Sequence, residues 1–263
     1  MTIIKIGGGE QINLEAIIED LVNLEDEFII VHGANALRDE IANKLHYEKK
    51  VLLSASGYSS VYSDSEALDI MMMSYAGLRN KRIVEMCQQV GINAIGLTGV
   101  DGKLIEGQRN KGIKIKEDGK LKIVRDFSGK PKTINIALLQ LLISNGYVPV
   151  ITVPIIDENN FAISSENDDI VALLKESLDA DRIFQLIEAP GFLDDVNNPN
   201  SVVKVISKEE VKQRETQVDG RMKRKMKALT KLFESGKTSV YICDGRKNNP
   251  ITNAINGEGT IIQ

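Results

Sequence analysis

TIIKIGGG, residues 2–9, is the stretch that decides the fold. Its β-branched run followed by glycines predicts a short buried strand that turns sharply into a loop. Glycines let backbone N–H groups approach an anion because no Cβ intervenes, and the adjacent Lys5 adds a mobile positive charge that suits phosphate. The stretch therefore indicates a phosphate-binding loop, although it matches neither the P-loop pattern nor the dinucleotide-binding glycine pattern. The alternative is a buried strand that simply ends in glycines.

The composition is that of a globular protein with one large or two modest domains. The chain has 263 residues, 42% of them hydrophobic, and a formal net charge of −4. A negative net charge disfavours nucleic-acid binding, and no apolar run is long enough to span a membrane. A strand begins almost at Met1, so we expect no secretory signal and a cytoplasmic protein.

Cysteine and histidine are too scarce to build a metal centre. Cys87 and Cys243 lie far apart in apolar sequence, which favours buried thiols over a disulfide or a metal pair. His32 and His46 are the only histidines. Because nothing in the sequence pairs His32 with a carboxylate, we interpret it as a residue that packs or that supports a neighbouring group, rather than as a catalytic base. We therefore expect no metal site built from protein side chains.

The unit of strand, glycine turn and helix recurs along the chain. Asn13 can cap a helix with one apolar face, and residues 28–31 form a second apolar strand that ends at His32-Gly33 before a helix at 36–45. This order predicts an α/β fold, with a mostly parallel sheet covered on both faces. Ligands in such sheets gather at the carboxyl ends of the strands, where Gly7–Gly9 and Gly33 are expected.

The middle of the chain carries weaker signals. Residues 46–62 are irregular and serine-rich, which fits either a lid over a substrate or a solvated hairpin. Ser63 with Glu66 has the spacing of a capping box, and Thr133 is expected to begin a helix. Residues 114–124 alternate around Asp118-Gly119, which predicts a β-hairpin. Its lysines fit a solvated face better than an acidic partner.

Two features of the second half carry charge at helix starts. Asp168 precedes an apolar helical pattern, where a carboxylate is an ordinary cap. Residues 220–227 place a run of cations, including Lys225, at the start of another helix, against the helix dipole. A polyphosphate would make that arrangement favourable, and the alternative is a basic surface helix.

Together these features indicate phosphoryl transfer. The transition state of that reaction needs positioning and cations more than a nucleophile or a general base from the protein. Lys5, Lys225 and backbone N–H groups can supply this, with Mg²⁺ on the nucleotide, and Asp168 between the lysines would hold them in place.

The sequence also resembles the amino acid kinase family from end to end, in the acetylglutamate kinase branch. The matching segments are Lys5-Ile6-Gly7-Gly8, Val31-His32-Gly33, Asn80-Lys81, Gly96-Leu97-Thr98-Gly99-Val100-Asp101-Gly102 and Gly220-Arg221-Met222-Lys223-Arg224-Lys225. Within the branch, the last segment and the ending Asp244-Gly245-Arg246, Asn249-Pro250-Ile251 and Gly257-Glu258-Gly259-Thr260 are most similar to the [LysW]-aminoadipate and [LysW]-glutamate kinases.

The resemblance implies a three-layer αβα sandwich that uses ATP and Mg²⁺, with an acceptor-binding and dimerisation lobe at 1–178 and a nucleotide lobe at 179–263. It implies that Lys5 and Lys225 bridge the phosphates, that Asp168 orients both lysines, and that homodimers form. The implied nucleotide-binding residues are Gly7, Gly8, Glu188, Gly191, Leu193, Asp244 and Arg246. The implied acceptor-side positions are Gly33, Ala34, Val61 and Ser164.

The sequence departs from the family pattern on the acceptor side. Ala34 stands where the family has a second glycine, Val61 where it has the arginine that grips the acceptor's α-carboxylate, and Ser164 where it has an asparagine. Losing a bidentate arginine could cost about 2–3 kcal/mol of carboxylate binding. Another cation would have to compensate, and the candidates are Arg38, Lys49 and Lys50.

Three functions follow as hypotheses. The first is an ATP-dependent kinase that makes an acyl phosphate on 2-aminoadipate or glutamate attached to a small acidic carrier protein of the LysW type, in lysine or arginine biosynthesis. The second is an acetylglutamate kinase that acts on the free small molecule. The third, of a different class, is a non-catalytic nucleotide-binding paralogue with a regulatory role. The resemblance implies neither a nucleic-acid partner nor a membrane partner.

Overall fold

The computed structural model describes residues 1–53, 59–117, 120–195, 197–216, 220–233 and 238–263, without the side chains of residues 59, 60, 113, 116, 117 and 220–225. An eight-stranded sheet forms the centre of the molecule, in the order β14-β16-β15-β13-β1-β2-β10-β5. Its pairs are parallel except for the antiparallel pair β15–β16. The strands are β1 (Thr2–Ile6), β2 (Phe28–His32), β5 (Ala94–Thr98), β10 (Val148–Thr152), β13 (Arg182–Ile187), β14 (Val205–Ile206), β15 (Ser239–Asp244) and β16 (Thr260–Ile262).

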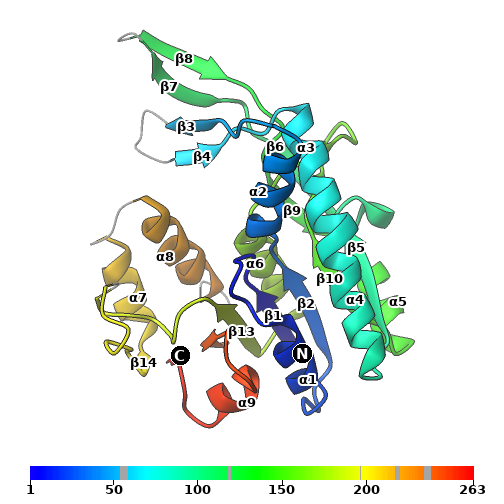
Figure 1. Ribbon diagram of the computed structural model, residues 1–263, viewed down its shortest axis with the longest axis vertical. Helices are drawn as coiled ribbons and strands as arrows, with labels where there is room; N and C mark the ends of the chain where they lie inside the picture. Colours follow the sequence, from blue (N-terminus) through cyan, green and yellow to red (C-terminus); the bar gives the residue numbers. More distant parts are fainter. Residues whose placement is uncertain (54–58, 118–119, 196, 217–219, 234–237) are drawn as a thin grey trace.

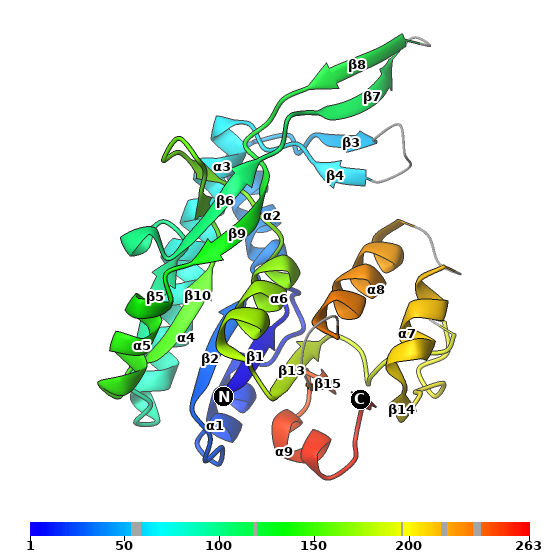
Figure 2. The same ribbon diagram turned by 180° about the vertical axis from the view of Figure 1, so that it is seen from behind.

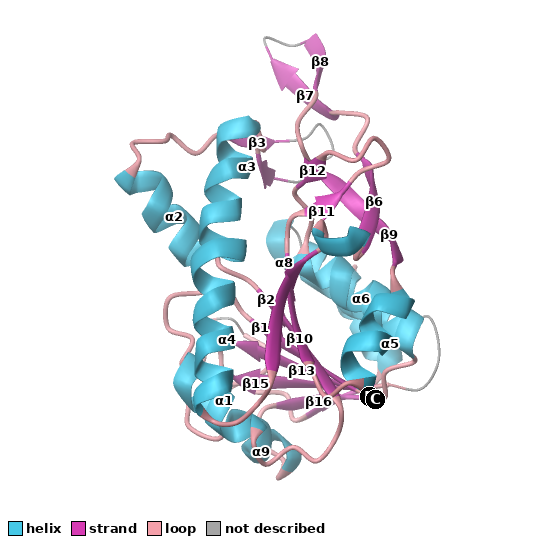
Figure 3. Ribbon diagram, turned by 90° about the vertical axis from the view of Figure 1, so that its right-hand side faces the viewer, coloured by secondary structure: helices cyan, strands magenta, loops and turns pink. Residues whose placement is uncertain are grey.

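Helices cover both faces of this sheet, which confirms the three-layer αβα prediction (Figure 3). One face carries α1 (Leu14–Leu21), α4 (Asn80–Gln89) and α9 (Pro250–Ile255). The other carries α5 (Ile136–Ser144), α6 (Asn167–Leu178), α7 (Lys208–Glu215) and α8 (Gly220–Leu232). None of the described helices is both long enough and apolar enough to cross a bilayer.

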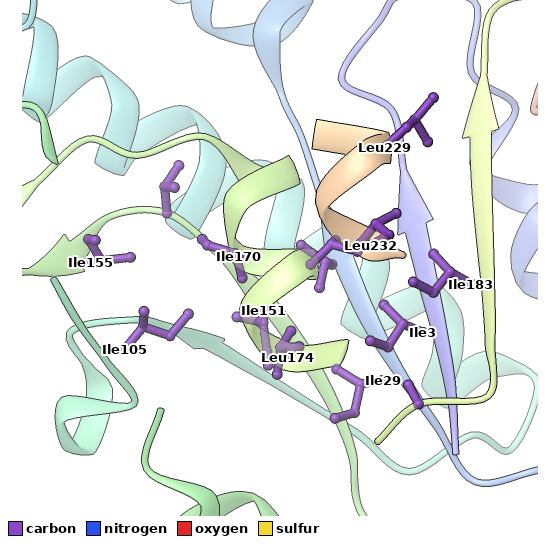
Figure 4. Packing of buried hydrophobic residues seen from close by; sticks show 14 of the residues in the cluster. Ile3, Ile29, Ile105, Ile151, Ile155, Ile170, Leu174, Ile183, Leu229 and Leu232 are labelled. Carbon is purple, nitrogen blue, oxygen red and sulfur yellow. The ribbon is translucent and has the colours of Figure 1, made fainter. Parts of the chain in front are cut away.

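Alternation along the strands divides the core into two clusters. Ile3 packs on the α6 side of the sheet, where Figure 4 shows it with Ile29 and Ile183 below Leu232. Its neighbour Ile4 packs on the opposite side, among residues of α1 and α4. Because side chains alternate with a period of two, Lys5 shares the α6 side with Ile3, and His32 shares the α4 side with Ile4. The two residues therefore face different helices.

A second group of elements extends beyond the carboxyl edge of the sheet (Figure 1). It contains α2 (Asn35–Lys44), α3 (Ser65–Met71) and the π-helix η1 (Met72–Arg79), which joins α3 to α4 as one long rod. A four-stranded sheet of β12 (Ala162–Ile163), β11 (Ile155–Ile156), β6 (Ile105–Arg109) and β9 (Gly129–Ile134) follows the 3₁₀ turn η2 (Asp101–Lys103). Two hairpins complete the group, β3 (Val51–Leu53) with β4 (Ser59–Val61), and β7 (Ile113–Glu117) with β8 (Lys120–Val124).

The hairpin predicted at 114–124 is confirmed by β7 and β8, although its turn residues Asp118-Gly119 lie outside the described residues. Between 46 and 62 the described residues form the β3–β4 hairpin, with an exposed Leu53, and residues 54–58 lie outside the description. The structure thus supports the hairpin interpretation of this segment for the part it describes.

Two predicted helix starts are wrong. The α3 cap is Asp64, whose Oδ1 accepts a hydrogen bond from the Ala67 N–H at 2.9 Å, so Ser63 and Glu66 do not form the capping box. Thr133 belongs to β9, because it pairs with β6, and the cap of α5 is Asn135. In both places the stronger capping residue lies one or two positions after the predicted one.

Candidate active site

Two glycine turns meet at the carboxyl edge of the sheet. Residues 7–9 follow β1 and residues 33–34 follow the neighbouring β2. A Cβ added to Gly8 would lie 2.6 Å from the backbone nitrogens of Ala34 and Asn35, closer than real Cβ atoms come. The Ala36 N–H donates to the Gly8 carbonyl at 2.9 Å and fixes the two turns together. The backbone here forms a cradle that a side chain at Gly8 would fill.

Lys5 lies beside this cradle and faces the start of α6. Its Nζ is 2.9 Å from Asp168 Oδ1, and both side chains are partly exposed. Asp168 is in the first turn of α6, and the strand periodicity of β1 directs Lys5 to that side of the sheet. The structure therefore brings together two of the three residues predicted to act in catalysis.

The third, Lys225, lies on α8, which packs beside α6 (Figure 2). Lys231 on α8 forms an ion pair with Asp169 on α6, with 2.8 Å between Nζ and Oδ1. The side chain of Lys225 lies outside the description, so its role stays a prediction.

Two buried polar atoms without partners lie just before Asp168 in the chain. In the part of the chain that the structure describes, Ser165 Oγ and Asn167 Oδ1 are buried and have no hydrogen-bond partner. Buried polar groups are normally satisfied, so unsatisfied atoms mark a place where a ligand can supply the partner. Ser164, predicted to bind the acceptor, uses its backbone to hold β9: Gly129 N–H donates to the Ser164 carbonyl at 2.9 Å.

Glu188 has a structural contact that its predicted nucleotide role did not include. Its Oε1 accepts a hydrogen bond from the Gln11 N–H at 2.6 Å, and a Cβ on Gly9 would collide with its carboxylate. The carboxylate thus holds the loop after β1 against the end of β13.

The other predicted nucleotide-side residues lie along the carboxyl ends of β13 and β15. Gly191 packs against Thr260, where an added Cβ would lie 2.8 Å from Oγ1, and Leu193 forms a bridge with Val202. Asp244 ends β15 and lines a shallow pocket together with Lys247, next to α9. The structure gathers these residues near the carboxyl ends of β13 and β15, and their role in nucleotide binding stays a prediction.

Asp244 is held by Arg246 through two hydrogen bonds of 2.7 Å, from Nε to Oδ1 and from Nη2 to Oδ2. Burial alone would raise the pKa of Asp244, but the hydrogen bonds from Arg246 outweigh it and lower that pKa. Asp244 therefore carries its charge at neutral pH, which suits an acceptor for hydroxyl groups.

Among the residues predicted to bind the acceptor, Val61 ends β4, and the three cations predicted to replace the missing arginine are all paired. Arg38 Nη2 lies 2.8 Å from Asp39 Oδ1, Lys49 Nζ lies 2.8 Å from Asp39 Oδ2, and Lys50 Nζ lies 3.9 Å from Asp64 Oδ2. Their charges are therefore partly neutralised by residues of the protein itself.

Sequence reasoning gave no role to Tyr75 and Arg79 of the long helix, which lie near Asn35 and His32, and noted Asn80 only as part of a family motif. The Tyr75 hydroxyl donates to Asn35 Oδ1, and burial raises the pKa of Tyr75 to about 12, so it stays neutral. Arg79 Nε and Nη2 are buried without a partner among the described residues, and burial lowers the pKa of Arg79. The helical spacing 75, 79, 83 was the available signal, but it is equally typical of core positions.

Comparison with known proteins identifies the family. The profile of the "Amino acid kinase family" matches residues 1–244. The chain belongs to the amino acid kinase family. Among its relatives, the [LysW]-aminoadipate kinase of Thermus thermophilus is 38% identical over 269 residues that cover 100% of both chains. The acetylglutamate kinase of Methanopyrus kandleri is 29% identical over 265 residues, again covering 100% of both.

Solved structures agree on the amino acid kinase fold. Giardia carbamate kinase superposes with a TM-score of 0.69 at 14% identity, covering 99% of this chain and 97% of that chain. At this identity the likeness concerns the fold alone.

Proposed function

We propose that this amino acid kinase transfers the γ-phosphoryl group of ATP to the side-chain carboxylate of 2-aminoadipate or glutamate while the amino group is attached to a LysW-type carrier protein. The observation that carries the proposal is the Lys5–Asp168 pair beside the double glycine cradle. The full-length identity of 38% to a [LysW]-aminoadipate kinase supports this acceptor over free acetylglutamate. The role would be cytoplasmic, in lysine or arginine biosynthesis.

The reaction forms one bond and breaks another. An oxygen of the acceptor carboxylate bonds to the γ-phosphorus, while the bond from that phosphorus to the bridging oxygen of ADP breaks and its electron pair leaves with ADP. No general base is required because a carboxylate is already ionised at neutral pH. Lys5 stabilises charge on the transferring group, and Asp168 holds the ammonium in place.

The cradle supplies backbone donors to the same group. Gly8 lets the Ala34 and Asn35 nitrogens come close to the loop after β1, and they belong to the first turn of α2 and its cap. α2 has no side-chain cap, so its first N–H groups and its dipole favour an anion. Mg²⁺ bound to the ATP phosphates would neutralise charge there; the described residues hold no cluster of acidic, histidine or cysteine side chains for it.

We further propose two lobes, 1–178 for the acceptor and 179–263 for the nucleotide, and a homodimer. β5 is the last strand of the sheet, and beside it Met73 and Leu78 are 45% and 44% exposed. An apolar-rich cleft of about 330 Å³ between η1 and β5 adjoins them. Sedimentation of wild type and Leu78→Glu tests the dimer, which the charged variant should dissociate.

The test is a hydroxylamine trap for acyl phosphates with Mg-ATP and four acceptors: glutamate, N-acetylglutamate, carrier-linked glutamate and carrier-linked aminoadipate. Hydroxamate with the carrier-linked acceptors alone is the expected result. Hydroxamate with free N-acetylglutamate would move the protein to the acetylglutamate kinases. No hydroxamate with any of the four acceptors, while ATP still binds, would favour a regulatory paralogue.

A further inference from the structure

His32, the residue before the second glycine turn, has hydrogen-bond partners at its backbone carbonyl and at both ring nitrogens. It ends β2 fully buried, and its carbonyl accepts from Thr152 Oγ1 on β10 at 2.9 Å. Its ring Nε2 lies 3.1 Å from Asn80 Nδ2, and its Nδ1 lies 3.3 Å from the Gly33 carbonyl. Each of these contacts must have one donor and one acceptor.

The orientation of the Asn80 amide is fixed by its other neighbours. Nδ2 lies 3.0 Å from the Val150 carbonyl, which can only accept, and Oδ1 lies 3.3 Å from Lys81 Nζ, which can only donate. A flipped amide would place oxygen against carbonyl oxygen and NH₂ against an ammonium. Asn80 therefore donates to His32 Nε2.

The position of the proton on the His32 ring follows from this hydrogen bond. Because Nε2 accepts, it carries no hydrogen, so the ring is neutral and its proton is on Nδ1, where it is donated to the Gly33 carbonyl. Burial and the nearby charge of Arg79 together lower the pKa of His32 to about 3, against the hydrogen bond to the Gly33 carbonyl, which raises it. Of the charged groups among the described residues, Arg79 opposes an imidazolium at His32, and Lys81 contacts Asn80 rather than His32.

We propose that Asn80 is a positioning residue: by locking His32 in the Nδ1–H tautomer it fixes the Gly33 carbonyl and aims the Ala34 N–H at the phosphoryl cradle. The Gly33 carbonyl and the Ala34 N–H belong to one trans peptide, so they point in opposite directions. A carbonyl held toward His32 turns the N–H toward Gly8, against which the Ala34 nitrogen lies. Neither Asn80 nor His32 touches the reacting atoms.

The first test reads the tautomer directly. The two histidines of the chain, buried His32 and exposed His46, make ¹⁵N-histidine NMR unambiguous, with His46 as the internal reference. We expect His32 to show a protonated Nδ1 and a bare Nε2 throughout pH 5.5–8. A proton on Nε2 in the wild type would overturn the proposal.

The second test reverses the hydrogen bond with Asn80→Asp. A carboxylate can only accept, so Nε2 must take a proton; in the neutral ring Nδ1 then becomes a bare acceptor facing the Gly33 carbonyl. We expect kcat at pH 8 to fall about 100-fold, the scale of a small misplacement of catalytic groups. As pH falls and the imidazolium forms, Nδ1–H donates to Gly33 again, so kcat relative to wild type should rise with the NMR midpoint of His32.

Gln89→Glu makes the same amide-to-acid change at an exposed position of the same helix and should leave kcat and its pH profile unchanged. If kcat of Asn80→Asp falls but its pH dependence does not follow the NMR midpoint of His32, the role of Asn80 is merely structural and the proposal is overturned. The kinetic arm rests on the proposed kinase activity. If wild type proves inactive, that function fails, and the Ala34 amide signal of Asn80→Asp decides instead: it must move with His32 protonation, and a stationary signal overturns the inference.

Discussion

Lys5 on β1 and Asp168 on α6 form an ion pair across 163 residues of chain, with 2.9 Å between Nζ and Oδ1. The pair joins the first strand to the helix that follows the four-stranded sheet, at the edge where the glycine turns meet. Removing either partner should leave the fold intact, because both side chains are partly exposed. The expected effect is a lower rate of phosphoryl transfer.

Lys5→Met and Asp168→Asn should each lower kcat by about 100- to 1,000-fold, the usual effect of removing one group that stabilises transition-state charge. Hydroxamate formation with Mg-ATP measures this. Lys212→Met, an exposed lysine of α7, is the matched control and should keep full activity. Wild-type turnover in Asp168→Asn would show that the lysine needs no carboxylate to hold it.

Gly8→Ala should abolish turnover, because the added Cβ would lie 2.6 Å from the Ala34 and Asn35 nitrogens and fill the cradle. Gly77→Ala is the matched control: its Cβ would meet only the Met72 carbonyl, at an ordinary 3.5 Å, and helix propensity favours alanine by about 1 kcal/mol. Calorimetry should show weaker nucleotide binding in Gly8→Ala than in Gly77→Ala. Equal affinity in both variants would contradict the cradle.

Asp20→Ala should lower the free energy of unfolding by about 3 kcal/mol, because it leaves buried donors without an acceptor. Asp20 Oδ2 accepts from the Ile251 and Thr252 N–H groups at 2.6 and 3.0 Å and thereby caps α9. Urea unfolding with an unchanged m value measures the loss. Glu19→Ala, on the exposed side of α1, should change stability by less than about 0.5 kcal/mol.

His32 should make the protein less stable in acid. Its pKa is lowered by burial from 6.5 to about 3, so between these values the unfolded chain binds a proton that the folded protein does not. Stability then rises with pH across that window, by up to about 1.4 kcal/mol per pH unit, and the contribution is level above it. Urea unfolding from pH 4 to 7 should show a slope that His32→Gln reduces and His46→Gln does not. Equal slopes in wild type and His32→Gln would contradict a buried neutral imidazole.

The local parts of the fold could be predicted from sequence because their signals are local. β2 covers the strand predicted at residues 28–31, and the cap at Asn13 is confirmed. Period-two and period-3.6 patterns and capping residues depend only on neighbours in the chain. The helix starts at Ser63 and Thr133 failed where two capping residues or two periods compete within a few positions.

Long-range contacts could not be predicted in the same way. The π-helical segment η1 turns Arg79 and Tyr75 inward, and no spacing rule distinguishes it from ordinary helix. His32 and Asn80, 48 residues apart, meet only because β2 and α4 pack together. The family resemblance identified the sequence segments that contain His32 and Asn80. The direction of the hydrogen bond between these two residues follows only from the surrounding donors and acceptors in the structure.

The position of β1 has a consequence for how the chain acquires its structure. β1 lies between β2 and β13, so its residues Thr2–Ile6 pair on one side with Arg182–Leu186. The edge of β1 that faces β13 can therefore be paired only after residues 182–186 have been synthesised. Pairings of such long sequence separation are formed slowly, and open apolar edges are sites of aggregation. The pairing of β1 with β13 is therefore expected to be a slow step, and the unpaired edge of β1 is a site of aggregation until it forms.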